Sequence, residues 1–233
     1  MTRESALRLA RRGTIVTIVS LVAFAGLYVR AIYFTPTERT QGLAQKIFYV
    51  HAPVAIWALV AFAVTGLLSL LYLWMKDRKL DALAASSAEV GLFFSVAMLT
   101  TGPIWGKTVW GTWWDWDARL TSTLFLFLLF IGYMVLRGAL TNPEVRVNYS
   151  AVLGILALAL VPFIHMTVYW FRTLHPEPVV LKPSRPSMPG EMLMTFLLGI
   201  GVFTIMYVGF MMQRYALTGL HEVREEEQAL GLS

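Results

Sequence analysis

The sequence predicts an all-α membrane protein: a polytopic bundle of six transmembrane helices with both termini on the cytoplasmic side, forming a single transmembrane domain over residues 1–233. Of the 233 residues, 57% are hydrophobic and 14% are charged, whereas a soluble domain carries roughly 25% charged residues. The mean hydropathy is +0.63. Charged residues are spaced so that they leave six apolar blocks, and about 20 apolar residues in a helix cross a bilayer. These observations exclude a soluble globular protein.

The six blocks, read from charge to charge, are residues 13–34, 47–75, 90–106, 120–136, 147–171 and 192–213. The first resembles a signal peptide, because Arg8, Arg11 and Arg12 precede an apolar run that contains Ala23-Phe24-Ala25. The run continues to Phe34, which favours an uncleaved membrane anchor.

A proline near the start of the second block and the short lengths of the third and fourth blocks predict how the outer face is arranged. Pro53 suits the first turn of a helix, so His51 is expected just before that turn. Blocks 90–106 and 120–136 are short and would reach about 25 Å, against roughly 30 Å of hydrocarbon. The segment that joins them and includes the end of the first, residues 104–119, is therefore expected to be drawn down to the membrane interface.

The distribution of the 19 Lys and Arg residues predicts the orientation. With the N-terminus inside, the cytoplasmic side carries more of them than the outer side, and four lie in the N-terminal tail. Arg30, Glu89 and Arg137 are predicted to snorkel to the interface. The net charge of +5 is attributed to topology and membrane lipid, and no nucleic-acid partner is expected. In either orientation, the loops after the first, third and fifth spans share one face.

The absence of cysteine limits the kinds of catalytic and metal site that the chain can form. It excludes disulfides, thiolate catalysis, iron–sulfur clusters and cysteine-rich zinc sites. Transition-metal ligands that bind through nitrogen are then limited to four histidines. These are His51, His165, His175 and His221.

Tryptophan is concentrated in the predicted outer-face segment 104–119. Five of the eight tryptophans lie there: Trp105, Trp110, Trp113, Trp114 and Trp116. An interfacial aromatic belt explains one or two per helix end, but not five around Gly106 and Gly111. A sheet of indoles edged by Lys107 and Arg119 suits a flat, conjugated, apolar molecule with anionic substituents. Stacking contributes about 1–3 kcal/mol per aromatic partner in nucleobase complexes, and the cations would hold carboxylates.

Two histidines share the face of this segment. His51 precedes the second span, and His175 lies in the proline-rich outer-face loop 172–191. One on each side of a planar macrocycle could coordinate its metal. His165 lies within the fifth span on one helical face with Arg172. It is read either as a functional intramembrane residue or as a neutral structural histidine.

Asp115 and Asp117 could be paired carboxylates for acid–base catalysis. Because Asp117 stands just before a predicted helix and near Arg119, the preferred interpretation is a helix cap or an ion pair.

The run Trp110-Gly111-Thr112-Trp113-Trp114-Asp115-Trp116-Asp117-Ala118-Arg119-Leu120-Thr121 resembles the WWD signature of haem-handling membrane proteins of cytochrome c biogenesis. The segments Lys46–Pro53 and Ile164–His175 are similar to the haem exporter protein C (CcmC) branch. The resemblance covers roughly residues 44–176.

The resemblance implies that His51 and His175 are axial ligands of a non-covalently bound haem b and that the tryptophan-rich segment, Asp117 included, forms its platform. Lys46, Lys107, Arg119 and Arg172 remain alternatives for the cations that meet the propionates. It also implies an inner-membrane location with the haem site on the periplasmic face. The implied partners are the haem chaperone CcmE, the small subunit CcmD and the transporter subunits CcmA and CcmB.

The predicted function is therefore to bind haem and deliver it to CcmE. This is a handling role rather than an enzymatic one, in which the chain could also promote covalent attachment of haem to the chaperone. Because no cysteine can form a thioether bond, the haem would be held reversibly. One alternative is a small electron-transfer subunit that uses b-type haem or quinone. Another is a transporter subunit in which the tryptophans are only an interfacial belt.

Overall fold

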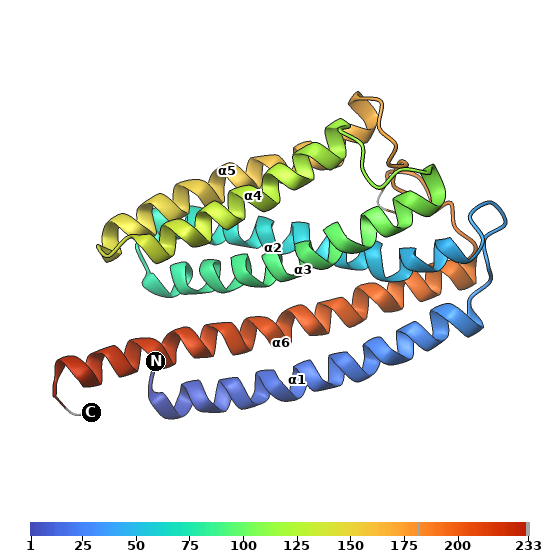
Figure 1. Ribbon diagram of the computed structural model, residues 1–233. Coiled ribbons are helices and arrows are strands. Elements are labelled where there is room, and N and C mark those ends of the chain that lie inside the picture. Colours follow the sequence, from blue (N-terminus) through green and yellow to red (C-terminus); the bar gives the residue numbers. More distant parts are fainter. Residues whose placement is uncertain (181, 232–233) are drawn as a thin grey trace.

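The computed structural model describes residues 1–180 and 182–231, which fold into six long helices (Figure 1). They are α1 (Arg3–Val29), α2 (Phe48–Met75), α3 (Arg78–Trp110), α4 (Ala118–Ala139), α5 (Pro143–Trp170) and α6 (Gly190–Ala229). A π-helical turn, Arg30–Phe34, continues α1, and a 3₁₀-helix, Leu43–Ile47, leads into α2. All six helices are long and apolar enough to cross a membrane, and the described residues form no strand. The predicted all-α class with six spans is confirmed.

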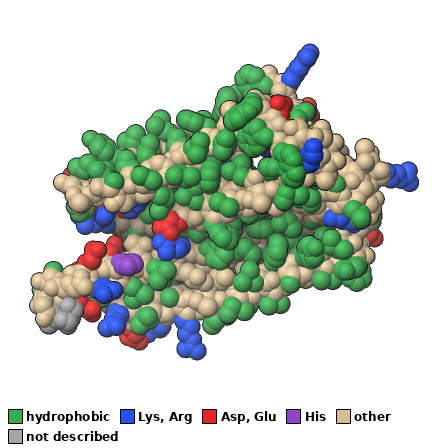
Figure 2. All heavy atoms as spheres, viewed as in Figure 1, with side chains coloured by type: hydrophobic (Ala, Val, Ile, Leu, Met, Phe, Trp, Pro, Cys, Tyr) green, Lys and Arg blue, Asp and Glu red, His purple; other side chains and the backbone are tan. Residues whose placement is uncertain are grey.

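The helices are arranged as a pair beside a group of four (Figure 1). Helix α1 packs along α6, whereas α2 contacts α3, α5 and α6, and α4 contacts α5 and α3. In Figure 1 both termini lie at one end of the bundle, and the connections α1–α2, α3–α4 and α5–α6 lie at the other. Figure 2 shows hydrophobic side chains over most of the visible bundle, with charged side chains mainly toward its ends. The three loops expected on one face thus lie together.

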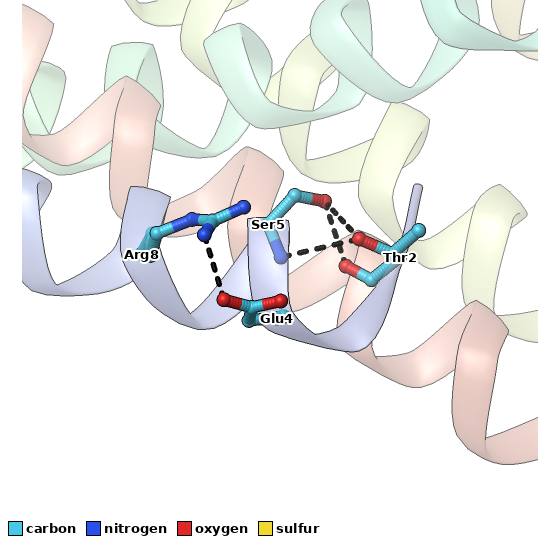
Figure 3. A network of polar contacts seen from close by, with 4 residues as sticks. All are labelled: Thr2, Glu4, Ser5 and Arg8. Carbon is cyan, nitrogen blue, oxygen red and sulfur yellow. Dashed lines mark hydrogen bonds and ion pairs between the residues drawn. The ribbon is translucent and has the colours of Figure 1, made fainter.

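The starts of α1, α3, α4 and α5 are fixed by side chains that accept hydrogen bonds from free backbone N–H groups. At the start of α1, Thr2 Oγ1 accepts from Ser5 N at 3.3 Å, and Arg8 pairs with Glu4 at 2.7 Å (Figure 3). Asn142 caps α5 in the same way, ahead of a proline at the first helical position.

Helix α3 is much longer than the block 90–106 from which it was predicted. It has 33 residues, which correspond to about 50 Å at 1.5 Å per residue. It begins after the N-cap residue Asp77 and continues through Trp105 to Trp110, so half of segment 104–119 is helical. The third span is therefore not short, so the premise on which this segment was expected to be drawn to the interface is wrong. The predicted apolar block begins after the last charged residue, so it leaves out the first turns of the helix, which contain charged residues.

The start of α2 also differs from the expectation. The helix begins at Phe48, so His51 lies within its first turn and Pro53 in the next. Proline leaves the carbonyl four residues earlier without its helical partner. Helix α6 lies very close at this point: a Cβ on Gly199 would stand 2.9 Å from Pro53 Cγ and 3.0 Å from Tyr49 O. Gly199 therefore allows α6 to pack against the first turns of α2.

Helices α2 and α5 are held together by small residues. A Cβ added to Gly66 would lie 2.6 Å from Gly154 O, and one added to Gly154 would lie 2.5 Å from Ser69 Oγ. Such close approach is typical of helix pairs in membranes. Nearby, the rings of Phe62 and Phe130 stack at 3.8 Å between centroids. This tight packing contrasts with the outer half of the same helix pair, where a cavity opens.

Candidate functional site

Two neighbouring cavities lie at the loop end of the bundle. The smaller, of about 90 Å³, lies between α2, α3 and the segment that follows Trp110. The larger, of about 560 Å³, lies between α2, α5 and the loop after His175, and its size is within the range of small-molecule sites. His51, Trp105, Arg119 and His175 line both cavities. The structure therefore brings His51 of α2 and His175 of the loop after α5 to one site.

His51 is fixed by a threonine on α3. Its Nδ1 lies 2.9 Å from Thr101 Oγ1, and the side chain is 9% exposed. The Thr101 hydroxyl donates to Ala97 O at 2.8 Å, so its oxygen accepts from Nδ1–H of His51. Gly102 makes room for the ring, because a Cβ there would stand 3.1 Å from His51 Cε1. The Nε2 atom is left unprotonated and free to bind a metal.

His175 is also protonated on Nδ1, but a different hydrogen bond determines this tautomer. Its Nδ1 lies 2.9 Å from Pro176 O, and a carbonyl only accepts, so Nδ1 carries the proton and Nε2 is free. Burial and the positive charge of Arg119 lower the pKa of His175 to about 3. The imidazole is therefore neutral at pH 7, which is the form that ligates a metal.

Arg119 is the cation of the site. Its side chain lines both cavities and donates one hydrogen bond, from Nη1 to Ile164 O at 3.3 Å. It forms no ion pair with a described residue, so most of its five N–H donors are available to an anionic ligand.

The tryptophans surround the smaller cavity rather than forming a sheet. Trp105 packs edge-on against His51 at 5.7 Å, and Trp110 lies tilted against His175 at 6.5 Å. Trp113 and Trp114 also line this cavity. The planes of Trp114 and Trp116 differ by 75°. The expected flat array of indoles is thus wrong, because Trp105 and Trp110 are on a helix and the others are on the irregular chain beyond it.

Comparison with known proteins places this sequence in a family. The family model described as heme exporter protein C matches residues 3–229. "Heme exporter protein C" of Haemophilus influenzae is 33% identical over 204 residues, which cover 88% of this chain and 83% of that protein. "Heme exporter protein C" of Escherichia coli strain K12 is 32% identical over 187 residues, or 76% of each chain. A Marchantia polymorpha protein described as ccmC-like, mitochondrial and of cytochrome c biosynthesis is 32% identical over 200 residues, which cover 86% and 80%.

The chain belongs to the haem exporter protein C family. Family membership and the six apolar helices identify a multi-pass membrane protein that takes part in haem handling for cytochrome c maturation. The resemblance to this family, predicted for roughly residues 44–176, therefore covers nearly the whole chain, residues 3–229.

Not every residue expected at the site of this family member faces a cavity. Lys107 is exposed and donates to Gly111 O at 2.9 Å. Arg172 is exposed beyond the end of α5, so it does not continue the helical face of His165. Trp116 is 74% exposed. His165 lines the larger cavity only.

The buried Lys46 is also removed from the set of cations open to a ligand. Its ammonium donates to the carbonyls of Thr35 and Pro36, in the loop between α1 and α2. It fixes that loop instead of facing either cavity. Arg119 is thus the one of the four candidate cations that lines the cavities.

Asp117 behaves as the preferred interpretation predicted and makes a second contact that was not expected. Its Oδ1 accepts from Leu120 N at 2.8 Å and so caps α4. Its Oδ2 accepts from Leu174 N at 2.9 Å. Asp117 does not itself line either cavity.

Several residues at the site were missed by reasoning from the sequence. Thr101 and Gly102 hold and accommodate His51, and Phe48 and Phe196 stack at 5.3 Å beside the larger cavity. Thr101 is 50 residues from His51 in sequence, and a single threonine at the end of a span carries no distinguishing pattern. Only the packing of α2 against α3 pairs the two.

Proposed function

We propose that this chain holds haem b non-covalently at the outer face of the membrane, and that His51 and His175 would both bind its iron. The observation that carries the proposal is the matched tautomer of the two rings. Each Nδ1–H donates to an oxygen of the protein, and each Nε2 is left free beside a shared pair of cavities. A hydrogen bond from the distal nitrogen orients a metal-binding histidine and increases its basicity.

Other residues of the site suit the flat ring of haem and its propionates. Trp105, Trp110, Trp113 and Trp114 supply aromatic walls, and Arg119 offers donors that match a propionate carboxylate. When bound, the haem iron would accept the two imidazole nitrogens, and this chain would supply orientation and charge. The segments 104–119 and 172–191 would then be the outer-face parts of the one transmembrane domain.

The proposed cellular role is delivery of this haem to the chaperone CcmE on the periplasmic side of the inner membrane. The ATP-binding-cassette subunits CcmA and CcmB and the small subunit CcmD would be its partners. The sequence has no cysteine, so haem can be held only by coordination and contact. Both are reversible, which is what a handover requires.

The test is a transfer reaction. The haem-loaded protein in detergent is mixed with the periplasmic domain of CcmE, and covalent haem on the chaperone is followed by haem staining of a denaturing gel. Wild type is expected to lose its haem absorbance as the stain appears on the chaperone. Arg119→Gln is expected to hold less haem, since a buried charge-assisted hydrogen bond contributes about 1.5–3 kcal/mol. The proposal would be contradicted if haem appeared on the chaperone while this protein kept its haem absorbance. It would also be contradicted if Arg119→Gln bound as much haem as wild type.

A further inference from the structure

The Asp117 carboxylate connects two segments that lie far apart in sequence. Oδ1 accepts from Leu120 N at 2.8 Å within α4, while Oδ2 accepts from Leu174 N at 2.9 Å, across 57 positions. The residue is 8% exposed, so water does not compete freely for these bonds. One carboxylate therefore ties the start of α4 to the outer-face loop.

Leu174 directly precedes His175, and few other hydrogen bonds anchor the loop around it, although Val180 and Met188 pack against the bundle. Helix α5 ends at Trp170 and α6 begins at Gly190. Thr173 Oγ1 donates to His175 O, and His175 Nδ1 donates to Pro176 O. Both bonds stay within the loop. Among the described residues 172–180, the Leu174–Asp117 bond is the hydrogen bond that reaches another helix.

We infer that Asp117 is a positioning residue for His175, and that it acts by holding the main chain one residue before the ligand rather than by touching haem. The inference rests on the proposed function for the role of His175. A carboxylate is needed because two acceptor oxygens serve two N–H groups at once. Asparagine offers one acceptor and one donor group, so it keeps the helix cap but cannot also accept from Leu174 N.

The first experiment measures the hydrogen bond from Leu174 N to Asp117, here called the tether, in the absence of haem. Hydrogen exchange of the haem-free full chain in detergent is followed by mass spectrometry for Asp117→Asn, and the Leu174 amide is expected to exchange about 10-fold faster or more. Asp115→Asn is the matched control. It removes the same charge two positions away. Asp115 is exposed and lines the smaller cavity, and it forms no hydrogen bond with a described residue of the loop. Unchanged exchange in Asp117→Asn, or an equal rise in the control, would overturn the inference.

The second experiment uses the absorption spectrum of bound haem to test whether His175 binds the iron. Asp117→Asn is expected to convert low-spin, two-histidine haem partly to the high-spin spectrum of His175→Ala, and added imidazole is expected to restore the low-spin form in both. The double variant should match His175→Ala alone, because both changes remove the same bond. A normal spectrum for Asp117→Asn beside an altered His175→Ala spectrum would overturn the inference. A normal spectrum for His175→Ala would instead refute the proposed function, and the exchange experiment would still decide the tether.

Discussion

At His51, one hydroxyl group determines which ring nitrogen faces the cavity. Thr101 Oγ1 gives its hydrogen to Ala97 O and so receives the Nδ1–H of His51. At His175 a main-chain carbonyl does the same. The sequence could identify the two histidines and the cap at Asp117 because each lies in a local pattern. It could not identify Thr101, or the bond from Asp117 to Leu174, because these depend on how distant segments pack.

Replacing Thr101 tests this control of the tautomer. In Thr101→Val the Nδ1–H of His51 loses its acceptor, and haem affinity is expected to fall about 10- to 100-fold, as for other partners of metal-binding histidines. The measurement is haem titration followed at the Soret band. Thr100→Val is the control, since Thr100 is exposed and bonds only to Val96 O in its own helix. Equal affinities for the two variants would show that Thr101 does not govern His51.

At the scale of the helices, the site depends on how closely α6 and α5 approach α2. The apolar blocks predicted which helices exist, but their ends were placed poorly where charges lie inside a helix. Arg137 and Glu89 were expected to snorkel, and this is wrong. Arg137 Nη1 pairs with Asp81 Oδ1 at 2.6 Å, and Arg214 Nη2 pairs with Glu89 Oε2 at 2.5 Å, so both charges link α3 to other helices.

Gly199→Ala tests the close approach of α6 to α2. The new Cβ would stand 2.9 Å from Pro53 Cγ, and such overpacking costs about 1–3 kcal/mol of stability. Thermal unfolding in detergent, followed by circular dichroism, should show a lower midpoint and a smaller bound fraction of haem. Gly201→Ala, two positions along the same helix, meets no atom within 4 Å and should be neutral or slightly stabilising. If Gly199→Ala matches this control, the α6–α2 contact is not as tight as described.

For the whole molecule, the decisive feature is that both termini lie at one end and the tryptophan-rich and histidine-bearing segments at the other (Figure 1). The number of spans predicted this common face in either orientation, because alternate loops of a six-span chain must share a side. The pairing of α1 with α6 beside the other four helices had no signal in the sequence. It follows from contacts between the first and last helices.

Labelling of single cysteines tests the orientation, and the natural chain offers no background because it has no cysteine. Thr37→Cys lies in the exposed α1–α2 loop and Glu226→Cys near the exposed end of α6. In intact spheroplasts, a membrane-impermeant maleimide is expected to label Thr37→Cys, and to label Glu226→Cys only after permeabilisation. The reverse pattern would place the site on the cytoplasmic side and contradict delivery to a periplasmic chaperone.

The central claim is that His51 and His175 both bind the iron of one haem. The most direct measurement is the absorption and electron paramagnetic resonance spectrum of the purified, haem-loaded wild type beside His51→Ala, His175→Ala and the double variant. Wild type is expected to be low-spin with two histidine ligands, each single variant to become high-spin and regain the low-spin form with imidazole, and the double variant to lose most of its haem. Spectra and haem content identical in all four proteins would contradict the account.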